Sequence, residues 1–285
     1  LLLLLPFAVF AQKRVFVIES YHAEFAWDAS YKRAMKESLG PGYQFDYFEM
    51  NTKRLSKDQH RKMADLAWEK YLAVKPDLVV LGDDAALEFL AHRFARTQTP
   101  VVYLGVNNNP RYYIPNTAEN FTGVMERPLL KRSIAFLHDL LPTAKRILVL
   151  FDDDVTAQVI RKEIFAGKSS VDVLGVMVEI RLLDNLKLWK EAVISSKGQY
   201  DACVIGLYQA VKDADGKPVD ADELITWVSR NSPIPTFAFW DFAVGADKTA
   251  GGLILSGKDM GVQASSLVKK ILDDGVAPRE IMPIY

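Results

Sequence analysis

The chain has 285 residues, more than the roughly 100 to 200 residues of a usual single core, so it predicts one large or two medium domains. Hydrophobic residues make up 49% and charged residues 25%, the composition of an ordinary folded protein. The formal net charge of -1 gives no electrostatic footprint for nucleic acid or for an anionic membrane. We therefore expect no nucleic-acid partner.

Residues 1–11, LLLLLPFAVFA, are an apolar run that ends with Val9 and Ala11 in the spacing of a small-residue cleavage site, which is typical of a secretory signal. Pro6 interrupts the run, which disfavours a buried first strand. The single cysteine, Cys203, can form no internal disulfide, and no cysteine stands at the signal junction to carry a lipid. These features predict export to a Gram-negative periplasm. They leave open whether the signal is cleaved or anchors the chain.

From residue 12 on, short β-rich runs alternate with helical patterns, as in βα units on a parallel sheet. The strands of the first series are RVFVIE, YQFDYFEM, DLVVLGDD and VVYLGVN. The first helix is predicted from about 28 to 39, closed by Gly40, and the long second helix begins with Ser56 and Gln59 in capping-box spacing. Its apolar face is predicted to carry Met63, Leu66, Ala67 and Leu72.

A polar bridge, NNNPRYYIPNTAEN, precedes a second α/β series. Its strands are FTGVME, RILVLFDD, VDVLGVMVEI, DACVIGLY and IPTFAFW. Three elements are left over, namely GGLILS, a helix of about 260–274 and PREIMPI. The repetition predicts two similar lobes, and the leftover elements predict that at least one lobe is discontinuous in sequence.

Ligands of open parallel sheets bind beyond the carboxyl ends of the strands. In the first series these positions carry Ser20, Tyr21, Trp27, Asp28, Gly82, Asp83, Asp84, Asn107 and Asn108. In the second series they carry Asp153, Asp154, Thr156, Tyr208, Trp240 and Asp241. Apolar surface with a few placed polar groups suits a small-molecule pocket, so these residues form the predicted ligand site.

Several of these residues have a structural alternative. Asp84, Asp154 and Thr156 each precede a helix, where they can equally be N-caps. Trp27 and Trp240 can be core residues. The asparagines after the fourth strand can support a turn without touching a ligand.

The motifs of common enzymes and metal proteins are absent from the sequence. There is no G-x-S-x-G elbow and no G-x-G-x-x-G after a strand, and Lys162 takes the place of the first glycine of a phosphate loop. The DADG stretch at 213–216 lacks two EF-hand ligands, because Val211 and Asp222 stand at their positions. Gly206 replaces the phospho-accepting Asp of a response-regulator receiver. We expect no catalytic residue, no metal and no cofactor.

Four stretches carry a resemblance to a known family: SYHAEFAWD, DLVVLGDDAAL, NFTGVMERPLLKRSIAFLHDLLPTAKRILVLFDD and IPTFAFWDFAVGADKTAGGLILSGKDMGVQASSLVKKILDDGVAPREIMPI. On them the chain resembles the type I periplasmic substrate-binding proteins, and specifically the ABC-transporter substrate-binding family that includes tryptophan-binding-like proteins. The first stretch and FWDFAVG also resemble the version of this domain found beside or within sensor histidine kinases.

The resemblance implies an α/β protein of two flavodoxin-like lobes with parallel sheets, joined by a three-segment hinge near residues 116–122, 240–244 and 275–279. The N-terminal lobe would hold residues 12–120 and 245–275, and the C-terminal lobe 121–244 and 276–285. Trp27 would lie against a ligand between the lobes, with Trp240 near the hinge.

The implied function is a monomeric periplasmic solute-binding protein. It would close on a small polar or amino-acid-like ligand and present it to an ABC transporter permease. The alternative is an extracytoplasmic ligand-sensing domain that acts with a sensor histidine kinase. Neither reading identifies the ligand.

Overall fold

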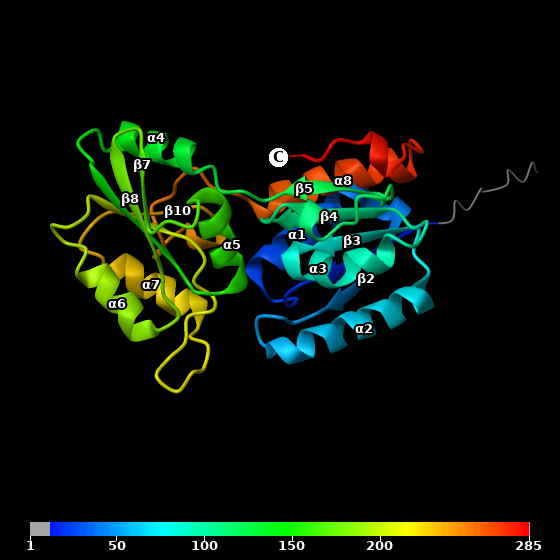
Figure 1. The fold of residues 1–285 in the computed structure, drawn as a ribbon, viewed down its shortest axis with the longest axis horizontal. Coiled ribbons are helices and arrows are strands. Elements are labelled where there is room, and N and C mark those ends of the chain that lie inside the picture. Colours follow the sequence, from blue (N-terminus) through cyan, green and yellow to red (C-terminus); the bar gives the residue numbers. More distant parts are fainter. Residues whose placement is uncertain (1–11, 285) are drawn as a thin grey trace, which may run out of the picture. The chain divides into compact units, whose positions relative to one another are not determined.

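The computed structural model describes residues 12–284, so the predicted secretory signal at 1–11 lies outside the described residues. Within the described residues the chain divides into two compact units. Unit 1 contains the residues up to Met125 and those from Lys258 on, and unit 2 is Glu126–Gly257. Each unit is an α/β sandwich with its own sheet (Figure 1).

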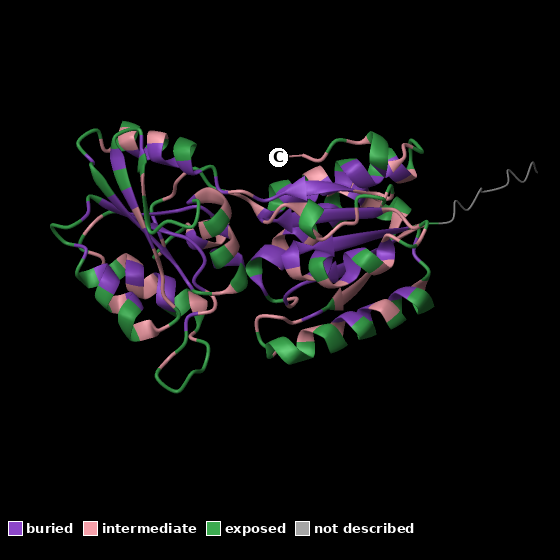
Figure 2. Cartoon of the chain, viewed as in Figure 1, coloured by how far each residue is buried: buried purple, intermediate pink, exposed green. Residues whose placement is uncertain are grey.

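Unit 1 contains a five-stranded parallel sheet in the order β2-β1-β3-β4-β5, which is the flavodoxin order. The strands are β1 (Lys13–Glu19), β2 (Tyr43–Glu49), β3 (Leu78–Gly82), β4 (Val101–Val106) and β5 (Phe121–Met125). The helices are α1 (Ala26–Leu39), α2 (Lys57–Val74), α3 (Asp83–Phe94) and α8 (Gly257–Leu272), with single 3-10 turns at Gly40–Gly42, Pro110–Tyr112 and Pro278–Glu280. The inner strands are continuous apolar runs because helices cover both faces of a parallel sheet (Figure 2).

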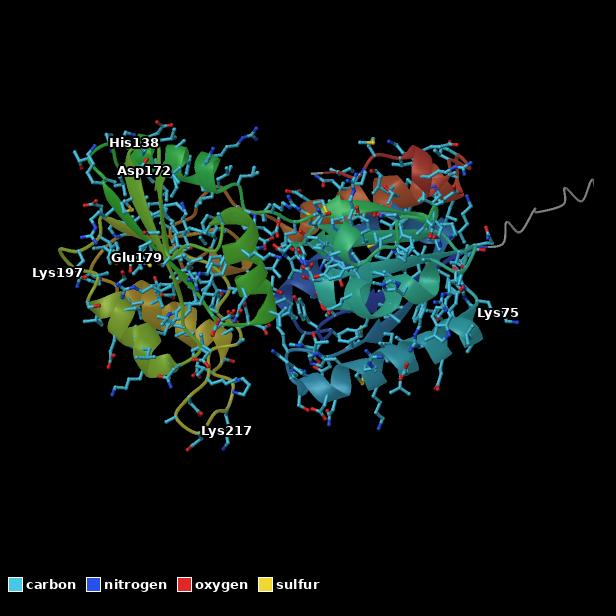
Figure 3. The ribbon with its side chains drawn as sticks, in the orientation of Figure 1. Lys75, His138, Asp172, Glu179, Lys197 and Lys217 are labelled. Carbon is cyan, nitrogen blue, oxygen red and sulfur yellow. The ribbon has the colours of Figure 1, made fainter. Side chains whose placement is uncertain are left out.

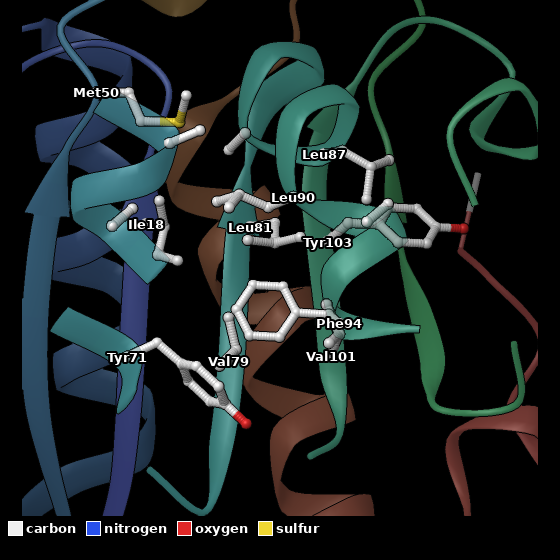
Figure 4. Close-up of a cluster of buried hydrophobic side chains, with 14 of the residues drawn as sticks. Ile18, Met50, Tyr71, Val79, Leu81, Leu87, Leu90, Phe94, Val101 and Tyr103 are labelled. Atoms are coloured by element: carbon white, nitrogen blue, oxygen red, sulfur yellow. The ribbon is translucent and has the colours of Figure 1, made fainter. Parts of the chain in front are cut away.

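The core of unit 1 forms where α2 and α3 cover one face of the sheet (Figure 4). Phe94 lies edge-on to Trp68 and Tyr71, with ring centroids 5.1 and 4.9 Å away. The predicted apolar face of α2 was partly wrong, because Leu66 and Leu72 are exposed. Ala67 is buried as predicted, and the helix also buries Ala64 and Tyr71.

Unit 2 contains a second five-stranded sheet in the order β10-β9-β6-β8-β7. Its strands are β6 (Arg146–Phe151), β7 (Ser170–Val173), β8 (Val176–Leu182), β9 (Ala202–Ile205) and β10 (Thr236–Ala238). Its helices are α4 (Leu130–Leu140), α5 (Val155–Ile164), α6 (Leu186–Ile194) and α7 (Ala221–Asn231), with a 3-10 turn at Asp241–Ala243. The expected single strand VDVLGVMVEI is a hairpin, because Leu174 and Gly175 both have positive φ and make a tight turn that sends β8 back antiparallel to β7.

The C-terminal segments divide differently from the expected lobes. Residues 251–256 run beside β10 in unit 2, where the Leu255 N–H donates to the Phe239 carbonyl over 2.6 Å. Ile284 forms a parallel bridge with Val124, which places the end of the described chain beside β5 in unit 1. The chain therefore passes between the units at 125/126 and 257/258, and residues 276–284 do not return to unit 2 as expected. Backbone hydrogen bonds to β5 and β10 decide both placements.

The surfaces of both units are charged, with Lys75, Lys197 and Lys217 among the exposed side chains (Figure 3). Cys203 is buried in β9, and burial raises the pKa of its thiol to about 12, as expected for a cysteine that acts as a small apolar side chain. None of the helices within residues 12–284 is long and apolar enough to cross a membrane.

Candidate functional site

Ser20 lies at the point of unit 1 where the strand order reverses, between the carboxyl ends of β1 and β3. Its hydroxyl donates to the Gly82 carbonyl over 2.6 Å and accepts from the Ala86 N–H over 2.8 Å. Gly82 has no room for a side chain, because an added Cβ would lie 2.5 Å from the Tyr31 hydroxyl. Both residues therefore hold the two strand ends and the start of α3 close together.

Two carboxylates, Asp28 and Asp83, are buried beside these strand ends. Asp28 stands in the first turn of α1, is 0% exposed, and neither of its oxygens has a hydrogen-bond partner among the described residues. Asp83 begins α3 with a left-handed φ of 67°. Its Oδ1 accepts from the Tyr21 hydroxyl over 3.1 Å, while its Oδ2 has no partner in the described chain.

Burial raises the pKa of Asp28 well above its ordinary value, and the neighbouring charges of Asp83 and Glu19 add to this rise. Burial likewise raises the pKa of Asp83, and the charge of Asp84 adds to it. Glu19, unlike Asp28 and Asp83, is paired with a cation, because Lys32 forms a 2.6 Å ion pair with it. The pKa of the Glu19 carboxyl is still raised, since burial outweighs the effect of that lysine.

The aromatic side chains after β1 form a small cluster above these acids. Tyr21 and Phe25 pack edge to face with centroids 4.9 Å apart, and the Lys53 ammonium lies 4.6 Å from the Tyr21 centroid. Trp27 is 2% exposed, and its Nε1–H has no partner among residues 12–284. Helix α1 begins at Ala26, two residues earlier than expected, so Trp27 is helical rather than part of the loop.

Asp84 holds the loop after β4. Its carboxylate accepts from the N–H groups of Asn107 and Asn108 over 2.9 and 3.1 Å. The position before the first helical residue of α3 is Gly82, so the N-cap alternative for Asp84 does not apply. Asn107 is buried with its Oδ1 unpartnered within the described residues, whereas the Asn108 amide donates to the Tyr113 hydroxyl. Ligand contact by these three residues stays a prediction.

In unit 2, Asp152 joins two neighbouring strand ends through hydrogen bonds, as Ser20 does in unit 1. The buried residue follows β6, its N–H donates to the Leu207 carbonyl over 2.6 Å, and its Oδ2 accepts from the Ala210 N–H over 3.0 Å. These bonds join the ends of β6 and β9, where the strand order of unit 2 reverses. An added Cβ on Gly206 would lie 2.4 Å from the Phe151 ring, so this junction is also closely packed.

The other predicted residues of unit 2 surround the same junction. Asp153 is exposed and accepts from the Gln158 amide over 2.8 Å. Asp154 occupies the N-cap position of α5, Thr156 is buried in its first turn, and Tyr208 is buried after β9. The Asp154 side chain makes no cap hydrogen bond to α5, so the structure does not support the capping alternative, and ligand contact by all four residues stays a prediction.

Trp240 and Glu126 form a buried pair that the sequence did not predict. The Trp240 Nε1–H donates to Glu126 Oε1 over 2.5 Å, and both side chains are at most 3% exposed. Phe151, Phe239 and Phe242 lie around the indole with centroids 6.0 to 6.1 Å away. Glu126 directly follows β5, so the rule that selected the other strand ends could have found it. Asp241, next to the tryptophan, is half-buried.

The structure thus gathers the predicted residues into two groups, one at the strand ends of each unit. No three histidine, cysteine or acidic residues within 12–284 are arranged to hold a metal ion. A cavity of about 490 Å³ lies elsewhere in unit 2 and contains none of the predicted residues. It is lined by Leu129, Leu130, Lys131, Arg132, Ile164, Val171, Asp172 and Val173.

No family model matches the chain, and no curated protein matches it. Solved structures do match. A domain from Streptococcus pneumonia in complex with L-Trp is 17% identical with a TM-score of 0.62, covering 96% of this chain and 90% of that one. A periplasmic sugar-binding protein from Legionella pneumophila is 12% identical with a TM-score of 0.64, covering 96% and 98%. A solute-binding protein from Bacillus halodurans with bound myo-inositol is 13% identical with a TM-score of 0.57, covering 97% and 93%.

These matches extend over nearly the whole of each chain, so the likeness includes both units. The chain has the fold of the type I periplasmic substrate-binding proteins. This confirms the expected fold class of two flavodoxin-like lobes, with the one antiparallel edge strand β7 as an addition. The neighbours are binding proteins rather than enzymes.

Proposed function

We propose that the protein is an extracytoplasmic solute-binding protein that delivers a small polar or amino-acid-like ligand to an ABC transporter permease. The observation that carries this proposal is the set of buried polar atoms at the carboxyl ends of β1, β3 and β4 that have no partner within the described chain. They belong to Trp27, Asp28, Tyr31, Asp83 and Asn107. Buried polar groups are nearly always satisfied, so a concentration of exceptions at a strand-order switch points to a ligand.

The comparisons support a solute as the ligand, because similarly folded proteins bind L-Trp or myo-inositol. In the proposed mechanism the ligand contacts strand ends of both units and shifts a balance between an open and a closed state. Unit 2 would contribute Asp153, Asp154, Thr156, Tyr208 and Asp241. A monomer suffices for this mechanism, and the proposal includes no catalytic step.

The partner that reads the closed state defines a second candidate function. SYHAEFAWD provides two of the five residues with unpartnered groups, Trp27 and Asp28, and this stretch resembles domains associated with sensor histidine kinases. In that case closure would be passed to a kinase rather than to a permease. Pull-down of membrane proteins with the ligand-loaded chain separates the two candidates, since only one of them predicts a permease in the captured material.

The first experiment is a thermal-shift screen of residues 12–285 against amino acids, sugars, polyols, nucleosides, polyamines and organic acids. The protein is first unfolded and refolded to remove any carried-over ligand. A ligand at a hundred times its dissociation constant adds about 2.7 kcal/mol of stability, which shifts the Tm of a chain this long by several degrees at most. Stabilisation by one chemical class supports the proposal, whereas no response from any class contradicts it.

A further inference from the structure

We propose that the ligand carries a protonated amine, that Asp83 and Asp28 of unit 1 bind this amine, and that its binding displaces one proton shared by the two carboxyls. This inference rests on the proposed solute-binding function and names the ligand class. It concerns only groups within unit 1. Polyols and sugars, which some proteins of this fold bind, are the neutral alternative.

The two carboxyls and a neighbouring tyrosine have unused hydrogen-bonding capacity. Both oxygens of Asp28 and Oδ2 of Asp83 accept no hydrogen bond from the described residues. The Tyr31 hydroxyl is a further observation beside the two acids. Tyr31 is 0% exposed, and its hydroxyl also has no partner in the described chain. The Tyr31 hydroxyl lies at the end of β3, because a Cβ added to Gly82, the residue before Asp83, would be 2.5 Å from it. Three side chains from two helices therefore leave buried polar atoms without partners near the end of β3.

The backbone of Asp83 has an unusual conformation. Its φ of 67° is left-handed, a conformation that few residues other than glycine adopt. Outliers of this kind cluster at ligand clamps, because the strain positions a side chain that an ordinary helix start would point elsewhere. Here the result is that Oδ1 binds the Tyr21 hydroxyl while Oδ2 stays available. Asp83 is 3% exposed and Asp28 is 0% exposed, so the amine reaches Asp83 first.

Several charged groups surround the two carboxyls. The titratable groups that face Asp28 are Asp83, Glu19, Lys32, Lys53 and Tyr31, and Asp83 additionally faces Asp84 and Tyr21. Lys32 already forms an ion pair with Glu19. Asp84 already accepts hydrogen bonds from the backbone N–H groups of Asn107 and Asn108. Lys53 compensates for one of the two buried carboxylates, and one proton on the pair removes the remaining negative charge.

A ligand cation can replace that proton without changing the net charge of the site. The proton leaves the carboxyl pair for the solvent, and the ammonium takes over its compensating charge and donates to the unpaired oxygens. A sugar hydroxyl could donate to these oxygens, but it would leave the proton in place. Amine binding and polyol binding therefore differ in proton release.

The test compares matched probes in the thermal-shift screen and follows them by titration calorimetry. Each L-amino acid is paired with the analogue that lacks the amino group, and putrescine, glucose and myo-inositol are included. We expect stabilisation only by compounds with a protonated amine. For the best of these, calorimetry in two buffers of different ionisation enthalpy should show release of about one proton, with the dissociation constant falling up to about tenfold per pH unit as pH rises.

Three variants separate the pair from the rest of the unit. Asp83→Asn should weaken binding of the amine probe at least about tenfold. Asp28→Asn should abolish proton release and flatten the pH dependence, and it should fold because the amide is close in shape to the protonated carboxyl that it replaces. Glu69→Gln, on the exposed face of α2, is the matched control and should change neither quantity.

The outcomes distinguish this inference from the proposed function. Stabilisation by sugars or inositol alone retains a solute-binding protein but overturns the amine. Binding of an amine without proton release, or with release that persists in Asp28→Asn, overturns the shared proton. If no compound of any class stabilises the protein, the proposed function itself fails, and the inference fails with it.

Discussion

The buried hydrogen bond between Trp240 and Glu126 gives a stability prediction with an internal control. Trp240→Phe removes the indole N–H that donates to Glu126 Oε1. Trp189→Phe removes the same atoms from a second fully buried tryptophan of unit 2, whose Nε1–H has no partner among the described residues. Both substitutions leave a similar cavity, so their difference isolates the hydrogen bond.

The magnitude follows from the two environments. A hydrogen bond to a charged group contributes about 1.5–3 kcal/mol, and loss of it leaves Glu126 without one of its donors. Trp189→Phe instead removes an unpaired buried donor, whose presence lowers the free energy of unfolding by about 1–3 kcal/mol. Trp240→Phe should therefore lower the free energy of unfolding by at least about 2 kcal/mol more than Trp189→Phe does.

Urea denaturation followed by far-UV circular dichroism measures both variants. Because both tryptophans lie in unit 2, they report on the same unfolding transition even if the units unfold separately. In a Glu126→Gln background the cost of Trp240→Phe should shrink, since the acceptor has lost its charge. Equal losses for Trp240→Phe and Trp189→Phe in the parent protein would refute the reasoning.

The other predictions concern pH, packing, ligand binding and thiol reactivity. The raised pKa of Asp28 makes the folded protein retain a proton that the unfolded chain releases above about pH 4. The free energy of unfolding should therefore fall as pH rises. Asp28→Asn should raise the Tm more at pH 8 than at pH 5. Gly206→Ala should cost about 1–3 kcal/mol by urea denaturation, since the new methyl meets a phenyl ring, and an unchanged midpoint would contradict that contact. Trp27→Ala and Asp241→Ala should each weaken binding of the screened ligand in calorimetry while the apo protein stays folded; unchanged affinity in both rejects the site. Cys203 should react with a thiol reagent only on unfolding, so rapid labelling of the native protein would contradict its burial.

The fold could be predicted because its strongest signals are local. Strands such as β3 and β4 are fully buried apolar runs, and helices follow the strands, such as α1, which Gly40 closes, so the βα repetition is visible in the residues alone. The tight turn at Leu174 was missed, because valines on both sides of it read as one strand. The return of the last segment to β5 was missed because a single bridge at Ile284 decides it, and such a pairing leaves no periodic pattern.

Strand ends could be selected from the sequence, but the state of each side chain could not. Asp83 and Asp84 are adjacent and chemically identical, yet one has an unpaired oxygen and the other accepts from two backbone N–H groups. The difference depends on the left-handed φ of Asp83 and on the position of the loop after β4, both set by tertiary contacts. Glu126 directly follows β5 and could have been selected by the same rule, but its role depends on its pairing with a tryptophan distant in sequence.

The two units use their equivalent strand junctions differently, and this suggests how binding is divided between them. Ser20 and Asp152 both join neighbouring strand ends through side-chain hydrogen bonds, and both have their bonds within their own unit. Unit 1 adds to its junction the unpaired atoms of Asp28 and Asp83, while the corresponding junction of unit 2 is closed by the packing of Gly206 against a phenyl ring. A change of ligand class should therefore follow substitutions in unit 1, whereas substitutions at the unit 2 junction should alter affinity without changing which class binds. Repeating the probe screen on Asp83→Asn and on a conservative unit 2 variant, Thr156→Ser, tests this division, and a change of preferred class in the latter alone would reverse it.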